Sequence, residues 1–148
     1  MSMQETQKVD DAVMAAWNSH NLDALVALCA DNIVWHDLAS PEPMRGKEGA
    51  RMFMQGWNTA FPDFVIQQKN RVVTDDQVAV EVAFSGTNKG PLQGPPGTPA
   101  IPATGKKVTN SKGAYFARVQ GGKVVEVHTY PDMPGMMMQL GLMPMPGK

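Results

Sequence analysis

The sequence has almost no cysteine and no concentration of charge of one sign. Cys29 is the only cysteine in 148 residues, so no disulfide can form within the chain, and its neighbours Leu25, Val26 and Leu28 predict a buried thiol. The formal charge is −1 at pH 7 and no run of Lys and Arg is present, which argues against a nucleic-acid partner. A small, roughly neutral ligand and a reducing compartment are favoured instead.

Long apolar runs are also missing. No segment approaches the length needed to cross a membrane, and the first residues, MSMQETQKVDD, are polar and acidic where a signal peptide would be basic and then apolar. We therefore expect a cytoplasmic protein without a membrane partner. A chain of this length fits one domain, spanning 1–148, with a single core.

Three segments in the first half have the spacing of helices. Apolar residues recur at helical intervals over 5–18, and Asn21 can cap a second helix that Asp31 and Asn32 then break. A third helix is expected over 47–60, where Pro62 disfavours helical geometry at the preceding residue.

The second half changes to the alternation typical of strands. Segments 64–73 and 77–86 predict one hairpin, and 106–120 and 123–130 predict another around the Gly121–Gly122 pair. Between the hairpins, the stretch GTNKGPLQGPPGTPAIPATG is too rich in Gly and Pro for a regular element. It is either a lid or binding loop, or a mobile surface loop.

One earlier strand lies between the second and third helices. In IVWHD, alternation places Val34 and His36 on one face, and Ile33, Trp35 and Asp37 on the other.

These elements predict an α+β cone, with N-terminal helices packed on a strongly curved antiparallel sheet and a short C-terminal helix. Such a fold leaves a deep, mostly apolar pocket between its layers. Large adaptable side chains are available either to line that pocket or simply to fill the core. They are Met14, Trp17, Trp57, Phe61, Met136, Met137, Met138 and Met143.

Several short motifs, weak singly but specific in their order, resemble one family. The runs NIVWHD, AFPDF, GTNKG, IPATGKKV and GGKVVEV, followed by an aspartate seven residues before QLG, are similar to the SnoaL-like polyketide cyclases of the NTF2-like superfamily. The similarity extends from about Val9 to Gly141. It implies the cone-shaped fold, a homodimer formed through the sheet, no metal or organic cofactor, and an intramolecular aldol ring closure on a polyketide-like ligand.

The resemblance also indicates where the sequence departs from the family. The catalytic aspartate of the last strand falls on Thr129, and its histidine partner falls on Tyr115. Threonine cannot act as a general base, but both side chains are expected to share a face and to hydrogen-bond a substrate carbonyl.

Three other residues are candidates for acid/base catalysis. His36 matches a family histidine that looks toward the pocket, although a purely structural role would also explain it. His128 points away from the pocket if alternation is strict, and a bulge would reverse it. Asp132 either moves a proton or caps the last helix. These histidines lack compact metal-ligand spacing, so no metal site is expected.

We therefore expect a cofactor-independent cyclase, lyase or isomerase that acts on a small apolar carbonyl compound. A non-catalytic small-molecule binding protein is the alternative, and a small ester or epoxide hydrolase is a third. An ionisable side chain in the pocket favours an enzyme, whereas an uninterrupted apolar lining favours binding.

Overall fold

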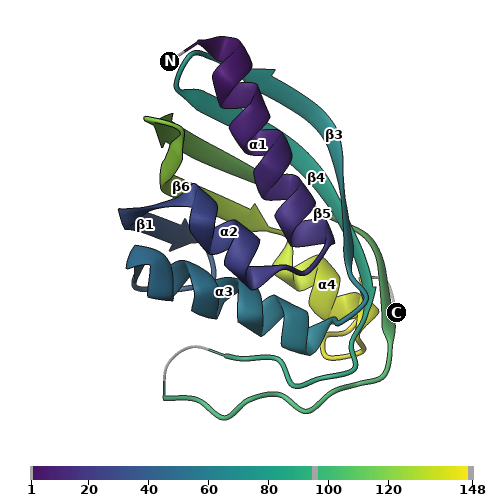
Figure 1. Cartoon of the computed structure of the whole chain (residues 1–148). Helices are drawn as coiled ribbons and strands as arrows, with labels where there is room; N and C mark the ends of the chain where they lie inside the picture. Colours follow the sequence, from purple (N-terminus) through teal and green to yellow (C-terminus); the bar gives the residue numbers. More distant parts are fainter. Residues whose placement is uncertain (1, 95–96, 147–148) are drawn as a thin grey trace.

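The computed structural model describes residues 2–94 and 97–146, so Pro95 and Pro96 of the expected long loop lie outside the described part. In these residues four helices pack on one six-stranded sheet (Figure 1). The helices are α1 (Met3–Asn18), α2 (Leu22–Leu28), α3 (Gly46–Ala60) and α4 (Met133–Gln139). The strands are β1 (Cys29–Asp37), β2 (Met44–Arg45), β3 (Val65–Val73), β4 (Gln77–Thr87), β5 (Lys107–Gln120) and β6 (Lys123–Pro131). The predicted α+β class is confirmed.

Local capping fixes where the first two helices begin. The Ser2 hydroxyl accepts a hydrogen bond from the Glu5 backbone N–H at 3.1 Å, so α1 begins two residues before the predicted start. Asn21 caps α2 as predicted, with its Oδ1 3.0 Å from the Ala24 nitrogen. That helix ends at Leu28, because the following residue already pairs in β1 rather than continuing the helix.

The sheet has the order β2-β1-β6-β5-β4-β3 and contains one parallel pair. β1 runs parallel to β6, whereas every other neighbouring pair is antiparallel. The expectation of a wholly antiparallel sheet was therefore wrong at this pair, because alternation within a strand carries no information about its direction relative to a distant partner. The β5–β6 turn agrees with the prediction, since Gly121 and Gly122 both have positive φ, at 57° and 79°.

The helices α1, α2 and α3 lie on one face of the sheet, and α4 follows β6 at the edge of this layer (Figure 1). The core between helices and sheet contains Trp17, Leu25, Ile33, Trp35 and Met54, all at least nine-tenths buried. A cavity also lies in this layer.

The long Gly- and Pro-rich segment is anchored at its base by Asn88, which is completely buried. The Asn88 amide donates to the carbonyls of Ala60 and Gly90 at 3.1 and 2.9 Å, and its Oδ1 accepts from the Thr104 nitrogen at 2.8 Å. Gly90 is required here, because a Cβ would lie 2.0 Å from the Thr59 carbonyl oxygen. The base of the loop is thereby fixed to the end of α3.

Candidate functional site

A cavity of about 130 Å³ lies between the helices and the sheet, and its walls are mostly apolar. A volume of this order accommodates a ligand with one aromatic ring. Of the predicted lining residues, Met14, Trp17, Trp57 and Met136 line it. None of the described residues of the 88–106 loop is part of its lining.

The other predicted lining residues lie elsewhere. Phe61 is fully buried behind the wall, where its ring stacks on Trp57 with 6.0 Å between centroids. Met137 packs against the core without reaching the cavity, Met138 does not line it either, and Met143 is exposed. Phe61 follows the last turn of α3 and packs inward toward β4, which removes it from the cavity surface.

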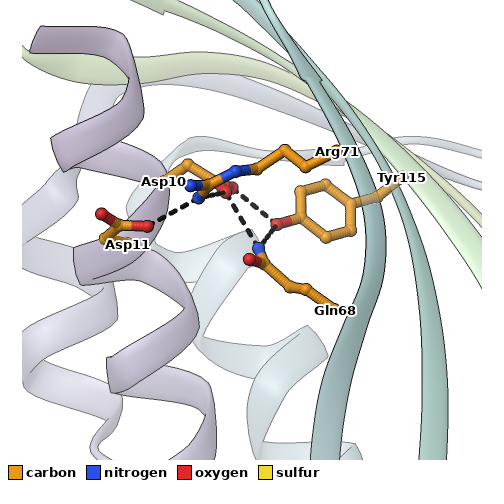
Figure 2. A network of polar contacts seen from close by, with 5 residues as sticks. All are labelled: Asp10, Asp11, Gln68, Arg71 and Tyr115. Atoms are coloured by element: carbon orange, nitrogen blue, oxygen red, sulfur yellow. Dashed lines mark hydrogen bonds and ion pairs between the residues drawn. The ribbon is translucent and has the colours of Figure 1, made fainter. Parts of the chain in front are cut away.

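A buried carboxylate from α1 is part of the cavity wall. Both of its oxygens accept hydrogen bonds (Figure 2). Asp10 is only 3% exposed. Its Oδ1 accepts from the Tyr115 hydroxyl at 2.5 Å, and its Oδ2 accepts from Gln68 and Arg71 at 2.9 and 3.0 Å. Gln68 also donates to the Tyr115 oxygen at 3.1 Å, and Arg71 bonds the exposed Asp11 at 2.6 Å.

The electrostatics of this network keep its donors protonated. Burial, followed by the neighbouring charge of Asp10, raises the pKa of Tyr115 well above its usual range. The hydrogen bond to Asp11 leads the causes that raise the pKa of Arg71. Tyr115 is therefore a neutral hydroxyl, and Arg71 a permanent positive charge beside the Asp10 carboxylate.

A second carboxylate lies on the cavity wall at the end of β1. Asp37 is in register with Thr129 on β6, and the Thr129 hydroxyl donates to Asp37 Oδ1 at 2.5 Å. The other oxygen, Oδ2, accepts from the Ala39 backbone N–H at 3.1 Å. Thr129 is in turn paired with Tyr115 on β5, as predicted. Three adjacent strands thus place Asp37, Thr129 and Tyr115 on the cavity side of the sheet.

The indole N–H of Trp35, two residues before Asp37, is a further polar group in this region. Trp35 is 4% exposed and lines the cavity, and its Nε1 has no hydrogen-bond partner among the described residues. A buried donor without a partner is rare in native proteins and calls for an explanation.

The two histidine candidates lie outside this cavity. His36 pairs in register with His128, and the two rings stack with centroids 4.4 Å apart. The expectation that His36 looks toward the pocket was wrong: Ile33 and Trp35 are buried against the helices, so alternation sends His36 to the opposite face. His128 also points outward, as strict alternation predicted, and its Nε2 lies 3.0 Å from a Glu126 carboxylate oxygen.

Asp132 is likewise absent from the cavity wall. Its Oδ1 accepts from the Gly135 N–H at 3.0 Å, so it caps α4, with Pro134 in the first turn. None of His36, His128 and Asp132 is therefore placed to move a proton in this cavity.

Sequence reasoning missed the four polar residues that the structure brings to this site. Asp37 could have been found, because it shares one face of the strand with Ile33 and Trp35, which are both buried. Asp10 could also have been found, since it lies seven residues before Trp17 on the same stripe of α1. Gln68 and Arg71 have no comparable local signal.

Two further findings concern metals and membranes. Within residues 2–94 and 97–146, no group of three or more His, Cys, Asp or Glu side chains is arranged to hold a metal ion. None of the helices in that part of the chain combines the length and the apolar character needed to span a bilayer.

Comparisons with known proteins agree with this architecture. A family model described as SnoaL-like polyketide cyclase matches residues 7–140. AclR from Streptomyces galilaeus, a candidate hydroxylase, is 26% identical with a TM-score of 0.81, covering 99% of this chain and 87% of its own. IdmH from Streptomyces antibioticus, a candidate polyketide cyclase, is 26% identical with a TM-score of 0.74. The match covers 92% of this chain and 98% of IdmH.

A protein of Catenulispora acidiphila with a ketosteroid isomerase-like fold is 22% identical, with a TM-score of 0.71 and coverage of 93% and 95%. At that identity the likeness concerns the fold alone, and the predicted NTF2-like architecture is confirmed. A search of curated protein sequences gives no significant match.

Proposed function

This chain belongs to the SnoaL-like polyketide cyclase family, and we propose that it binds a small, mostly apolar carbonyl compound in the cavity and converts it by acid/base chemistry through an enolate. The observation that carries the proposal is the Asp37 carboxylate on the cavity wall, hydrogen-bonded to Thr129. The family resemblance implies an aspartate at position 129. Asp37 supplies, from the neighbouring strand, the carboxylate that this position lacks.

In this proposal Asp37 is the general base. It takes a proton from the carbon next to the substrate carbonyl, so the C–H bond breaks and its electron pair moves toward the carbonyl oxygen as an enolate. The enolate carbon then attacks a second carbonyl of the same molecule, which closes a ring, and Asp37 returns the proton to the new alkoxide. Thr129 and the Ala39 N–H orient the carboxylate but leave other lone pairs free.

The enolate oxygen needs a hydrogen-bond donor. The indole N–H of Trp35, which has no partner among the described residues, lies on the same strand face as Asp37 and is buried, so it would bond a ligand oxygen once the ring shifts toward the cavity. Tyr115 is a second donor, because its raised pKa keeps the proton on its hydroxyl. To donate to the enolate oxygen, the Tyr115 hydroxyl must give up its hydrogen bond to Asp10. The Asp10 carboxylate would retain its hydrogen bonds from Gln68 and Arg71.

One observation supports the alternative of a non-catalytic binding protein. Both residues that the resemblance implies for proton transfer are replaced, by Thr129 and Tyr115, and each hydroxyl already donates to a carboxylate. The ionisable Asp37 in the cavity favours the enzyme over this alternative.

Propiophenone in D₂O distinguishes the two functions. Its single aromatic ring suits the cavity volume, and its α-hydrogens exchange slowly without a catalyst. We expect the protein to accelerate α-deuterium incorporation by about 100-fold over buffer, followed by NMR. Saturable binding in a calorimetric titration with no accelerated exchange would overturn the enzymatic proposal and leave the binding protein.

The outer face of the sheet is the proposed homodimer contact. It carries Phe116 and Tyr130, which are 42% and 44% exposed and meet edge to face at 6.0 Å. Large exposed aromatic side chains on a sheet face are typical of association surfaces.

A further inference from the structure

A second hollow, of about 270 Å³, lies beside the end of β1. It is formed by His36, Asp37 and Tyr130 together with the segment 38–43 that follows the strand. Asp37 and Tyr130 are also among the residues that line the main cavity, so the two spaces adjoin at these residues. The proposed base therefore has an apolar space on one side and a more polar space on the other.

Hydrogen bonds hold the walls of this hollow in place. The Leu38 N–H donates to the Thr129 carbonyl and the Ser40 N–H to the Asp37 carbonyl, each at 3.0 Å. The Ser40 hydroxyl donates to the Glu42 carbonyl at 2.8 Å, and two prolines limit the remaining backbone freedom. The hollow is thus a feature of the ordered chain rather than a gap beside a loose loop.

The polar groups that face this hollow have spare hydrogen-bonding capacity. The ring of His36 is fixed by its stacking on His128, yet neither of its nitrogens has a hydrogen-bond partner in the described part of the chain. A neutral imidazole offers one donor and one acceptor. The Asp37 carboxylate accepts, and its negative charge repels another anion.

From this geometry we propose that the second hollow binds a hydroxyl-bearing arm of the ligand, while the apolar ring lies in the main cavity and the reacting carbonyl lies between them at Asp37. The inference rests on the proposed function and specifies its substrate class as a hydroxyketone. A hydroxyl can donate to Asp37 or His36 and accept from His36. The described residues that line the hollow include no Lys or Arg, so a carboxylate arm in the same place would meet the charge of Asp37 without either residue to balance it.

Three aryl ketones with the same ring test this proposal by calorimetric titration at one protein concentration. They are propiophenone, 3-hydroxypropiophenone and 3-benzoylpropionate, which carry no arm, a hydroxyl arm and a carboxylate arm. We expect the hydroxyketone to bind with a Kd about five- to tenfold lower than that of propiophenone, the gain of one or two hydrogen bonds. The keto acid should bind no more tightly than propiophenone.

Variants then assign the gain to the hollow. His36→Phe keeps an aromatic ring to stack on His128 but removes both nitrogens, so it should raise the Kd of the hydroxyketone about fivefold and leave that of propiophenone unchanged. His128→Phe is the matched control, because His128 lines neither space. It should change neither Kd.

The failures of the two proposals are distinguishable. If propiophenone and the hydroxyketone bind equally well, or if His36→Phe weakens both to the same extent, the second site is refuted while the cavity proposal stands. If neither ketone binds, the proposed function fails and the second site with it. Tighter binding of the keto acid would overturn the assignment of a hydroxyl arm.

Discussion

Asp10 is the buried charge through which α1 is attached to the sheet. It lies on the helix, and its three partners Gln68, Arg71 and Tyr115 come from β3 and β5 (Figure 2). Removing Asp10 leaves the buried Tyr115 hydroxyl without its acceptor and leaves Arg71 with only the exposed Asp11, which costs more than the interactions themselves contribute.

Arg71 allows a matched comparison of a buried and an exposed partner. Its Nη1 bonds both Asp10, whose side chain is 2% exposed, and Asp11, whose side chain is 56% exposed. We predict that Asp10→Ala lowers the free energy of unfolding by about 3 kcal/mol, and that Asp11→Ala lowers it by less than about 1 kcal/mol. Urea denaturation measures both values. Equal effects would show that the network does not hold α1 in place.

Cys29 links burial to the pH dependence of stability. Burial is the main cause that raises the pKa of its thiol from the ordinary 9.0 to about 11. Between these values the unfolded chain loses the thiol proton and the folded chain keeps it, so stability is fully present below pH 9 and falls as the pH rises toward 11. The same burial should leave the native thiol unreactive toward disulfide reagents.

We therefore predict that wild-type protein loses about 2 kcal/mol more stability than Cys29→Ala between pH 9 and pH 11. Urea denaturation at several pH values gives the difference in the free energy of unfolding. The contributions of the other titrating groups are common to both proteins and cancel in this difference. Parallel pH profiles for the two proteins would refute the assignment.

The short helix α4 depends on its cap. With seven residues it has little stability of its own, and Asp132 satisfies the N–H of Gly135. We predict that Asp132→Ala lowers the free energy of unfolding by about 1 kcal/mol, while Asp132→Asn, which retains an accepting oxygen, is nearly neutral. Neither should slow ketone exchange. A stable Asp132→Asn variant without exchange activity would return Asp132 to the catalytic candidates.

The elements that could be predicted are those whose signals are local. Asn21 caps the helix that follows it, and the Gly121–Gly122 pair forms the turn it predicts. The pairing of β1 with β6 could not be predicted, because the partners are joined by most of the chain and no turn sets their direction. The orientation of His36 could not be predicted either. The alternation of β1 separates its two faces but does not show which face the helices cover.

The proposed homodimer gives a prediction for the whole molecule. Phe116→Glu places a charge in the middle of the exposed aromatic pair on the outer face of the sheet. We expect it to convert a dimer into a monomer in sedimentation experiments. Val72→Glu, at an apolar position on β3 that is even more exposed and lies at the edge of the sheet, is the control and should remain dimeric. A wild-type monomer, or a dimeric Phe116→Glu variant, would contradict the proposed contact.

The candidate site was predictable only in part, for a physical reason. Large apolar residues such as Trp17 and Trp57 predict an apolar cavity lining, and the pairing of Tyr115 with Thr129 follows from the hairpin. A carboxylate that reaches the same space from another strand requires the three-dimensional register, which brings Asp37 beside Thr129. The site is a property of the assembled sheet rather than of any one motif.

The rate of α-deuterium incorporation into propiophenone by Asp37→Asn tests the central claim most directly. Asp31→Asn is the control, because Asp31 lies on the same strand with a side chain 97% exposed. We predict that Asp37→Asn still binds the ketone but exchanges its α-hydrogens about 100-fold more slowly than the wild type and Asp31→Asn. Exchange by Asp37→Asn at the wild-type rate would contradict the assignment of Asp37 as the base.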